Sequence, residues 1–318
     1  MNSLRVAFFG SPDFAIPTLR ALIDSPYRPI VVITQPDRPS GRGRVLQPPP
    51  VKEAAVAAGI PVLQPEKLRD ADAIDALAAY KPDLQIVVAY GQILPSAVLD
   101  LPAHGTLNVH ASLLPRWRGA APVQGAILAG DEGTGVTIMR VDEGEDTGDI
   151  LATQVESIFS DDDAGSLSDR LQDIGASLLL KTIPAWLAGR ITPIPQDQRL
   201  VTRARRIKKQ QGRVDWTEPA TSIARRVRAF SPWPGAFSTL DGHAIRIWQA
   251  TATDASSDQE PGTVVGDGET IDVSTGAGFL QVARLQRAGK RATSAAEFTR
   301  GAANLIGLQF EVGKATDA

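Results

Sequence analysis

Short apolar runs alternate with helical patterns over the first part of the chain. The apolar runs predict strands at residues 4–9, 30–34, 60–63, 84–89, 106–110 and 136–141. Helical spacing of apolar residues lies between them, around Leu19 and Leu22 and at residues 51–58, 70–80 and 167–187. Such alternation with short connections is typical of an open, mostly parallel α/β sheet. We therefore predict a Rossmann-like sheet for residues 1–189.

The pattern changes after residue 189. Residues 189–213 are rich in Pro, Gln and Arg, as in a connection between domains. A helical segment at 222–230 precedes short alternating runs at residues 236–240, 244–249, 262–265, 271–274 and 279–285. Several short strands at nearly even spacing indicate a small β-barrel, of which the OB-like type is one case. The predicted organisation is an α/β domain (1–189), a basic linker (190–208) and an OB-like barrel (209–318).

Length and composition are those of a two-domain globular protein. The chain has 318 residues, of which 43% are hydrophobic and 22% charged. No apolar run approaches the roughly 18 residues that span a bilayer, and the first strand is too short for a signal-peptide core. The absence of cysteine excludes disulfides and thiolate zinc sites. We expect a cytoplasmic protein without a membrane partner, and a monomer.

The charge is unevenly distributed. Residues 1–190 carry 16 Lys and Arg against 23 Asp and Glu, whereas residues 191–318 carry 17 against 13. The excess of positive charge begins in a run from Arg199 to Arg213 that contains no acidic residue. A basic second half predicts contact with a polyanion. A solvated linker remains the alternative interpretation of this run.

The first candidate chemistry lies at the end of the predicted strand 106–110. Side chains two apart on a strand share a face, so Asn108 and His110 project together. In parallel α/β sheets, ligands bind beyond the carboxyl ends of strands. An amide and an imidazole at that position suit the stabilisation of a developing oxyanion and the transfer of a proton. Alternatively, both side chains only satisfy backbone groups of the following loop.

An acidic loop provides the second candidate. Residues 142–149 contain five acidic side chains, and Gly144 and Gly148 permit a tight turn that directs a carboxylate at His110. A solvated turn is the alternative. The loop lacks the ligand order of an EF-hand, and the three histidines have no metal-ligand spacing, so no metal site is predicted. Dinucleotide, Walker A and G-x-S-x-G motifs are also absent.

Three motifs together resemble the folate-dependent formyltransferases: Asn108-x-His110, Ser112-Leu113-Leu114-Pro115 followed by Gly119, and Asp146-Thr147-Gly148-Asp149. Further segments are similar to the methionyl-tRNA formyltransferase branch of that family and extend the likeness over essentially the whole chain. They include residues 9–14, 34–39, 88–91, 120–124, 134–139, 214–216 and 228–234. Ala111, Gly125 and Arg287 depart from the family pattern without touching the catalytic motifs.

The resemblance implies transfer of the formyl group of 10-formyltetrahydrofolate to the α-amino group of methionine on initiator tRNA. It implies that Asn108 binds the oxyanion, that His110 donates or carries a proton, and that Asp146 orients His110 and helps to remove the amine proton. The folate is then a co-substrate, with no tightly bound cofactor and no metal. Its implied contacts are Ser112, Leu113, Leu114 and Pro115, with Tyr90 and Gly91 near the pterin.

The resemblance also implies where the tRNA binds. Family members use the loop 36–50 near the acceptor end, and here it carries Arg38, Arg42 and Arg44. Together with Arg206, Lys208 and Lys209 in the basic run, these residues predict phosphate contacts that position the tRNA without reading bases.

Two other functions remain open at this stage. A formyltransferase that acts on a small amine, such as a nucleotide sugar, would keep Asn108, His110 and Asp146 but lack the basic linker. A non-catalytic RNA-binding protein would have no need of the intact trio.

Overall fold

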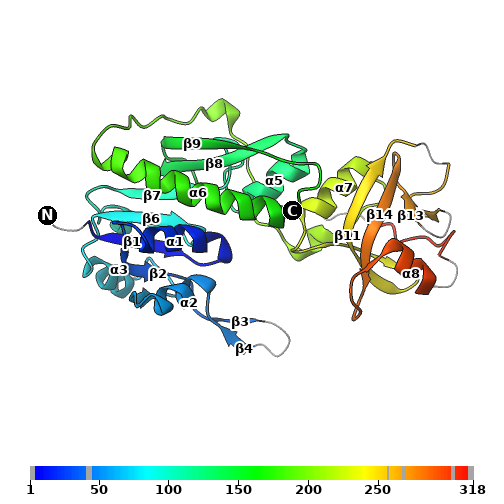
Figure 1. Ribbon diagram of the computed structural model, residues 1–318, viewed down its shortest axis with the longest axis horizontal. Coiled ribbons are helices and arrows are strands. Elements are labelled where there is room, and N and C mark those ends of the chain that lie inside the picture. Colours follow the sequence, from blue (N-terminus) through cyan, green and yellow to red (C-terminus); the bar gives the residue numbers. More distant parts are fainter. Residues whose placement is uncertain (1–3, 41–44, 256–257, 267–269, 302–304, 314–318) are drawn as a thin grey trace. The chain divides into compact units, whose positions relative to one another are not determined.

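The computed structural model describes residues 4–40, 45–255, 258–266, 270–301 and 305–313 (Figure 1). The chain divides into two compact units. The first comprises Met1–Pro122, Gly133–Ser157 and Ser168–Arg203, and the second comprises Val123–Glu132, Ile158–Leu167 and Ala204–Ala318.

A seven-stranded sheet forms the centre of the first unit. Its strands follow the order β5, β2, β1, β6, β7, β8, β9. The first five are parallel, while β8 runs antiparallel to both of its neighbours. The predicted open, mostly parallel sheet is therefore confirmed. The bounds are β1 (Val6–Gly10), β2 (Pro29–Ile33), β5 (Val62–Leu63), β6 (Leu84–Val88), β7 (Thr106–His110), β8 (Gly133–Arg140) and β9 (Ile150–Ser157).

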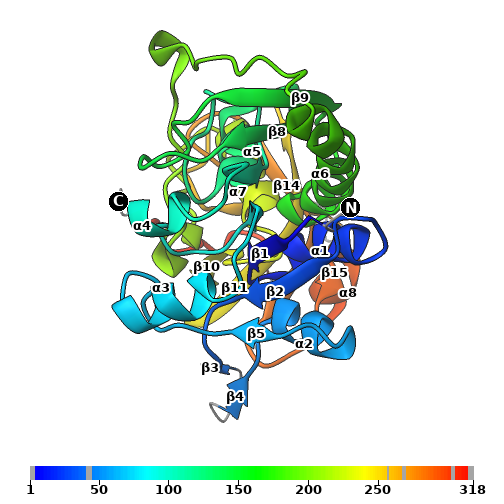
Figure 2. The same ribbon diagram turned by 90° about the vertical axis from the view of Figure 1, so that its left-hand side faces the viewer.

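Helices cover both faces of this sheet. Figure 2 shows α1 (Ile16–Ile23) and α6 (Ala164–Leu187) on one side, with α3 (Ala71–Ala78) and α4 (Ser96–Leu99) on the other. Alternate strand residues such as Phe9 and Ile33 form a buried cluster with Leu77 of α3 and Val98 of α4. The remaining elements of the first unit are η1 (Asp13–Ala15), α2 (Pro50–Ala57), η2 (Gln198–Leu200) and the hairpin of β3 (Arg38–Ser40) and β4 (Val45–Gln47).

Strand β7 determines which face carries the candidate chemistry. Leu107 and Val109 are buried. A Cβ added to Gly175 of α6 would lie 2.6 Å from Cγ1 of Val109, so Val109 faces α6. Because side chains alternate along a strand, Asn108 and His110 face the opposite side of the sheet. Burial of the two apolar residues thus fixes the direction of the two polar ones.

The second unit contains the predicted barrel. Its antiparallel strands follow the order β10, β11, β14, β13, β12, and β15 pairs with β14. Residues Gln309 and Phe310 bridge Thr263, next to β12, and Leu240 at the end of β10, which closes the sheet on itself. The bounds are β10 (Ala236–Leu240), β11 (His243–Thr253), β12 (Val264–Val265), β13 (Ile271–Ser274), β14 (Phe279–Arg287) and β15 (Thr293–Ser294).

Trp216 lies at the centre of the barrel core. It is fully buried, its ring centroid lies 4.9 Å from that of Phe310, and its indole N–H donates to Ser238 Oγ at 3.1 Å. The buried aromatic ring thus has its one polar atom satisfied. Helices α7 (Ala220–Ala229) and α8 (Ala295–Gly301) and the turn η3 (Lys209–Gly212) complete this part of the chain.

Two stretches from earlier in the sequence belong to the second unit. One contains most of α5 (Pro122–Ala129), where the carbonyl of Ala129 accepts a hydrogen bond from Arg225 at 3.4 Å. In the other, Asp162 O accepts from Arg228 at 2.9 Å and the Asp163 carboxylate from Ser231 at 2.7 Å. These bonds join sequence-distant segments, which the pattern along the chain does not reveal.

The predicted boundary at Gly189 differs from this division, because the first unit continues to Arg203. Ile194 exchanges two backbone hydrogen bonds with Ile150, at 2.8 and 2.9 Å. The carbonyl of Thr202 accepts from the N–H of Arg118 at 3.0 Å. Residues 194–203, called the strap below, therefore find their backbone partners in the first unit. Of the predicted linker, residues 204–208 belong to the second unit.

The pattern also missed several elements. Strand β9 was not predicted because half of its side chains are exposed, so it lacks the apolar alternation of a half-buried strand. The hairpin β3–β4 and the helices α4, α5 and α8 were not predicted either. No helix in the described part of the chain is both long and apolar enough to cross a membrane.

Candidate active site

The structure brings the three predicted catalytic residues together. Asn108 is half-buried on β7, and His110 is buried at its end. Asp146 lies in the loop between β8 and β9, with its Oδ2 atom 3.6 Å from Nδ1 of His110. The carboxylate is thus directed at the imidazole, as the acidic-loop hypothesis expects.

The other ring nitrogen of His110 fixes its tautomer. Nε2 lies 3.0 Å from the carbonyl oxygen of Trp117. Because a carbonyl can only accept, Nε2 carries the proton of this bond. Trp117 has a φ of 61°, in the left-handed region that non-glycine residues rarely adopt. Nδ1 is therefore the nitrogen that faces Asp146 and is open to a second proton.

A second bond holds the Asp146 carboxylate. Its Oδ2 atom accepts the backbone N–H of Gly119 at 2.8 Å. Asp146 also has a left-handed φ, 53°, a strained conformation for a residue with a Cβ. Oδ1 has no hydrogen-bond partner among the described residues. One oxygen of this carboxylate is thus engaged, and the other is free to accept a proton.

The Asn108 amide has no hydrogen-bond partner within the described ranges. It shares the face of β7 with His110 and remains partly exposed. An unengaged amide N–H₂ beside the imidazole suits the binding of an oxyanion that develops during a reaction.

The predicted folate-binding loop is anchored to β8 through Thr137. The Thr137 hydroxyl donates to Ser112 O at 2.7 Å and accepts from the Leu114 N–H at 3.1 Å. Ser112 and Leu114 are buried, whereas Leu113 and Pro115 are half-buried. The structure therefore leaves parts of Leu113 and Pro115 accessible, while Ser112 and Leu114 hold the loop in place.

The predicted pterin contacts, Tyr90 and Gly91, differ in exposure. The Tyr90 side chain is 2% exposed and packs edge-on against Phe9 at 5.4 Å between ring centroids. Burial raises the pKa of Tyr90, and its hydroxyl has no partner among the described residues. Gly91 is exposed, with a φ of 85°. A Tyr90 contribution to ligand binding is thus limited to its backbone and its packing in the core.

The predicted tRNA contacts lie in two places. Arg38 is exposed and pairs with Glu66 at 2.9 Å, and Arg42 and Arg44 lie outside the described residues. In the basic run, the neighbouring Arg199 and Arg213 pair with Asp197 and Glu311. The predicted contacts Arg206, Lys208 and Lys209 are exposed and form no ion pair among the described residues.

The analysis of motifs missed the residues that hold the site from behind. Gln196 is 7% exposed, and its amide donates to Asp146 O at 2.9 Å and Gly148 O at 2.7 Å. Arg118, 2% exposed, donates from Nε to Oε1 of Gln196 at 2.9 Å. The pKa of Arg118 is lowered by burial and by the charge of Arg203, against the opposing effect of Asp142 and Asp146. No pattern along the sequence indicates that either residue is buried.

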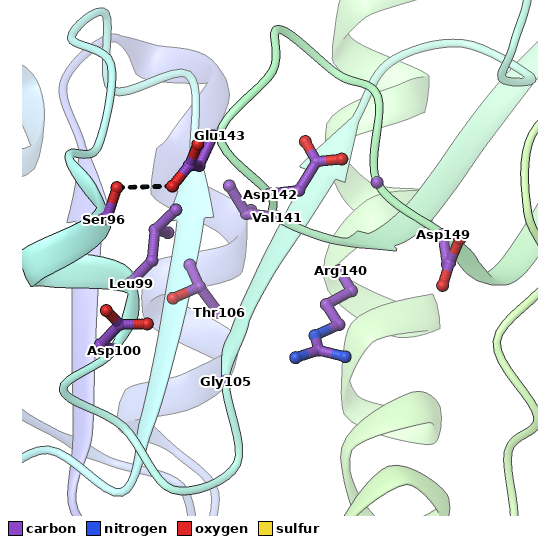
Figure 3. A pocket seen from close by; sticks show the side chains of 11 residues that line it. Ser96, Leu99, Asp100, Gly105, Thr106, Arg140, Val141, Asp142, Glu143 and Asp149 are labelled. Atoms are coloured by element: carbon purple, nitrogen blue, oxygen red, sulfur yellow. Dashed lines mark hydrogen bonds between the residues drawn. The ribbon is translucent and has the colours of Figure 1, made fainter.

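A cavity of about 290 Å³ lies behind the acidic loop (Figure 3). Its walls include Thr106 at the start of β7, Arg140 at the end of β8, and Asp142 and Asp149 of the loop. Ser96 of α4 donates to Glu143 at 2.6 Å across one side. None of the trio lines it. Part of the loop that carries Asp146 therefore borders open space, at Asp142, Glu143, Gly148 and Asp149.

Among the described residues, no group of three or more His, Cys, Asp or Glu side chains is arranged to hold a metal ion.

Comparison with known proteins agrees with the fold. Residues 4–183 match the family model described as formyl transferase, and residues 206–303 match the model for the formyl transferase C-terminal domain. The chain is therefore a formyltransferase in both of its parts.

The relatives that carry a name show to which branch of the formyltransferases the chain belongs. Methionyl-tRNA formyltransferase of Methylococcus capsulatus is 50% identical over 295 residues, covering 93% of this chain and 96% of that protein. The methionyl-tRNA formyltransferase of Halorhodospira halophila is 52% identical over 299 residues, with the same coverage. The chain belongs to the methionyl-tRNA formyltransferase family.

Two solved structures share the fold at low identity. The N-formyltransferase of Helicobacter canadensis, in complex with folinic acid and dTDP-3-aminofucose, superposes with a TM-score of 0.64 at 17% identity and covers 89% of this chain and 99% of its own. HypX of Aquifex aeolicus, in complex with tetrahydrofolic acid, gives a TM-score of 0.60 at 18% identity, covering 93% and 47%.

Gly148 offers a test of the acidic loop. A Cβ at this position would overlap the carbonyl oxygen of Arg140, so Gly148→Ala must shift the backbone that carries Asp146. We expect the formylation kcat to fall about tenfold or more, since small displacements of catalytic groups are costly. Gly133→Ala is the control, because its Cβ would find its nearest neighbour at 3.5 Å. A folded Gly148→Ala protein with the kcat of the control would contradict the importance of this loop position.

Proposed function

We propose that this protein transfers the formyl group of 10-formyltetrahydrofolate to the α-amino group of methionyl initiator tRNA, with Asn108, His110 and Asp146 as its catalytic residues. Relatives about half identical over nearly the whole chain support the reaction. The observation that carries the residue assignment is the Asp146 carboxylate, directed at His110 beside the free Asn108 amide.

The reaction needs two charges to be stabilised at once. The neutral amine attacks the formyl carbon, and the C–N bond that forms gives a tetrahedral intermediate with a negative oxygen and a positive nitrogen. The Asn108 amide donates to that oxygen. One well-placed donor of this kind contributes on the order of a hundred- to thousandfold in rate.

Proton transfer falls to His110 and Asp146. Asp146 Oδ1 has no partner in the described part of the chain, so it is available to accept the proton of the attacking nitrogen. Nδ1 of His110 faces Oδ2 of Asp146 at 3.6 Å, so the imidazole can pass a proton to or from the carboxylate during the reaction. The intermediate collapses when the bond to the folate nitrogen breaks, and that nitrogen takes up the proton that left the amine, delivered from Asp146 or through His110.

The folate acts as a co-substrate in this proposal, with no tightly bound cofactor. The accessible parts of Leu113, Pro115 and Gly91 are the proposed contacts, on the loop that Ser112 and Leu114 anchor and beside buried Tyr90. A structural relative solved with tetrahydrofolic acid supports a folate site in this fold.

The proposed tRNA contacts are Arg206, Lys208 and Lys209, together with Arg38, Arg42 and Arg44. The first three support the proposal best, because their exposed charges are not neutralised by a neighbour. A tRNA substrate supports a location in the cytoplasm, and we propose that the protein acts there as a monomer.

The direct test is a formylation assay with purified protein, 10-formyltetrahydrofolate and charged tRNA. Methionyl initiator tRNA should be formylated much faster than methionyl elongator tRNA. Asn108→Ala, His110→Ala and Asp146→Ala should each lower turnover by about a hundredfold or more with near-normal folding, because each residue acts on developing charge. A purified His110→Ala protein with wild-type turnover would refute the residue assignment, and equal rates on both tRNAs would refute the substrate.

Salt dependence tests the phosphate contacts. Replacing Arg206, Lys208 and Lys209 together with Gln should flatten the plot of log affinity for tRNA against log salt, by about one slope unit for each lost phosphate contact. The matched control replaces three arginines that are already ion-paired, Arg199, Arg213 and Arg291. Equal slopes for wild type and the first triple variant would identify the run as a solvated linker.

A further inference from the structure

Gln196 uses both donors and the acceptor oxygen of its amide at one place. Its two N–H groups go to the carbonyls of Asp146 and Gly148, and its oxygen accepts from Arg118. Two carbonyl acceptors on one side and a guanidinium donor on the other permit only one orientation of the amide. The side chain is 7% exposed, so water does not compete for these bonds.

Gln196 binds the main chain of Asp146, which is in a strained conformation. Asp146 is in the left-handed region at a φ of 53°, and such strain persists only where the surroundings impose it. Within the loop, the Asp142 carboxylate accepts from Gly144 N at 3.0 Å and from the Thr147 hydroxyl at 2.6 Å, but these contacts are exposed.

Arg118 connects this support to the opposite loop. It precedes Gly119, whose N–H binds the Asp146 carboxylate. Its own backbone N–H donates to Thr202 of the strap, and its guanidinium contacts Gln196 and, at 3.3 Å, Gln198. The same short segment therefore fixes the Asp146 side chain directly and the Asp146 main chain through Gln196.

We propose that Gln196 is a positioning residue for formyl transfer: its amide holds the strained Asp146 peptide and thereby directs the Asp146 carboxylate at His110, while Arg118 orients the amide. This proposal rests on the catalytic roles proposed above. It assigns a part in the reaction to the strap, a segment that contributes none of the catalytic side chains.

Two variants distinguish the effect of the Gln196 hydrogen bonds from the effect of its side-chain volume. Gln196→Glu keeps the acceptor for Arg118, and turns it into an ion pair, but replaces the N–H donors by an oxygen that faces two carbonyls. Gln196→Met keeps the approximate volume and loses both kinds of bond. Gln198→Glu is the matched control, because it makes the same charge change beside the same guanidinium on an exposed side chain.

We expect Gln196→Glu and Gln196→Met to lower kcat by about ten- to hundredfold. The KM values for the folate and for the tRNA should stay within about twofold of wild type, because uniform binding is unchanged. Gln198→Glu should keep the wild-type kcat. Thermal unfolding of each variant shows whether the fold is retained.

The decisive comparison adds Gln196→Glu to Asp146→Ala. If Gln196 acts through Asp146, the second substitution should cause no further loss of kcat, whereas a general structural defect would add to it. An additive loss, or wild-type kcat in both folded Gln196 variants while Asp146→Ala is inactive, would overturn this proposal alone. Wild-type kcat in Asp146→Ala would overturn the catalytic assignment and this proposal with it.

Discussion

The Asp146 carboxylate is the point where two loops of the first unit meet. Its Oδ2 atom receives the N–H of Gly119 and faces the imidazole of His110. The loop after β7 supplies Gly119 and the Trp117 carbonyl that fixes the other side of the ring. Each loop thus restrains the other, and the reacting groups sit between them.

Packing of the apolar core determines which way Asn108 and His110 face. Polar contacts hold the acidic loop in place. Leu107 and Val109 are buried, which leaves Asn108 and His110 on the reactive face of β7. Hydrogen bonds from the Gln196 amide, which Arg118 orients, then hold the acidic loop. Burying a charged guanidinium costs free energy, and a core of apolar side chains is stable without it. We interpret Arg118 as a residue kept for the geometry of the site.

The local pattern of apolar and polar residues was sufficient to predict the central sheet. Strand β7 matches its predicted bounds because apolar and polar residues alternate along it. The first candidate pair, Asn108 and His110, followed from that alternation, and Gly148 correctly indicated a tight loop. The polar edge strand β9 was missed, because exposed edges lack an apolar signal. Gln196 and Arg118 could not be predicted, since their partners are distant in sequence and the residue types alone are compatible with an exposed linker.

The central claim is the state of the His110 ring between Trp117 and Asp146, and side-chain ¹⁵N NMR of the wild-type protein measures it directly. The chain has only three histidines, so the signals of His110 can be assigned with one variant. The account predicts that the neutral ring carries its proton on Nε2, and that Nδ1 is the nitrogen whose signal changes in Asp146→Ala. A neutral ring protonated at Nδ1, unaffected by the loss of Asp146, would contradict it.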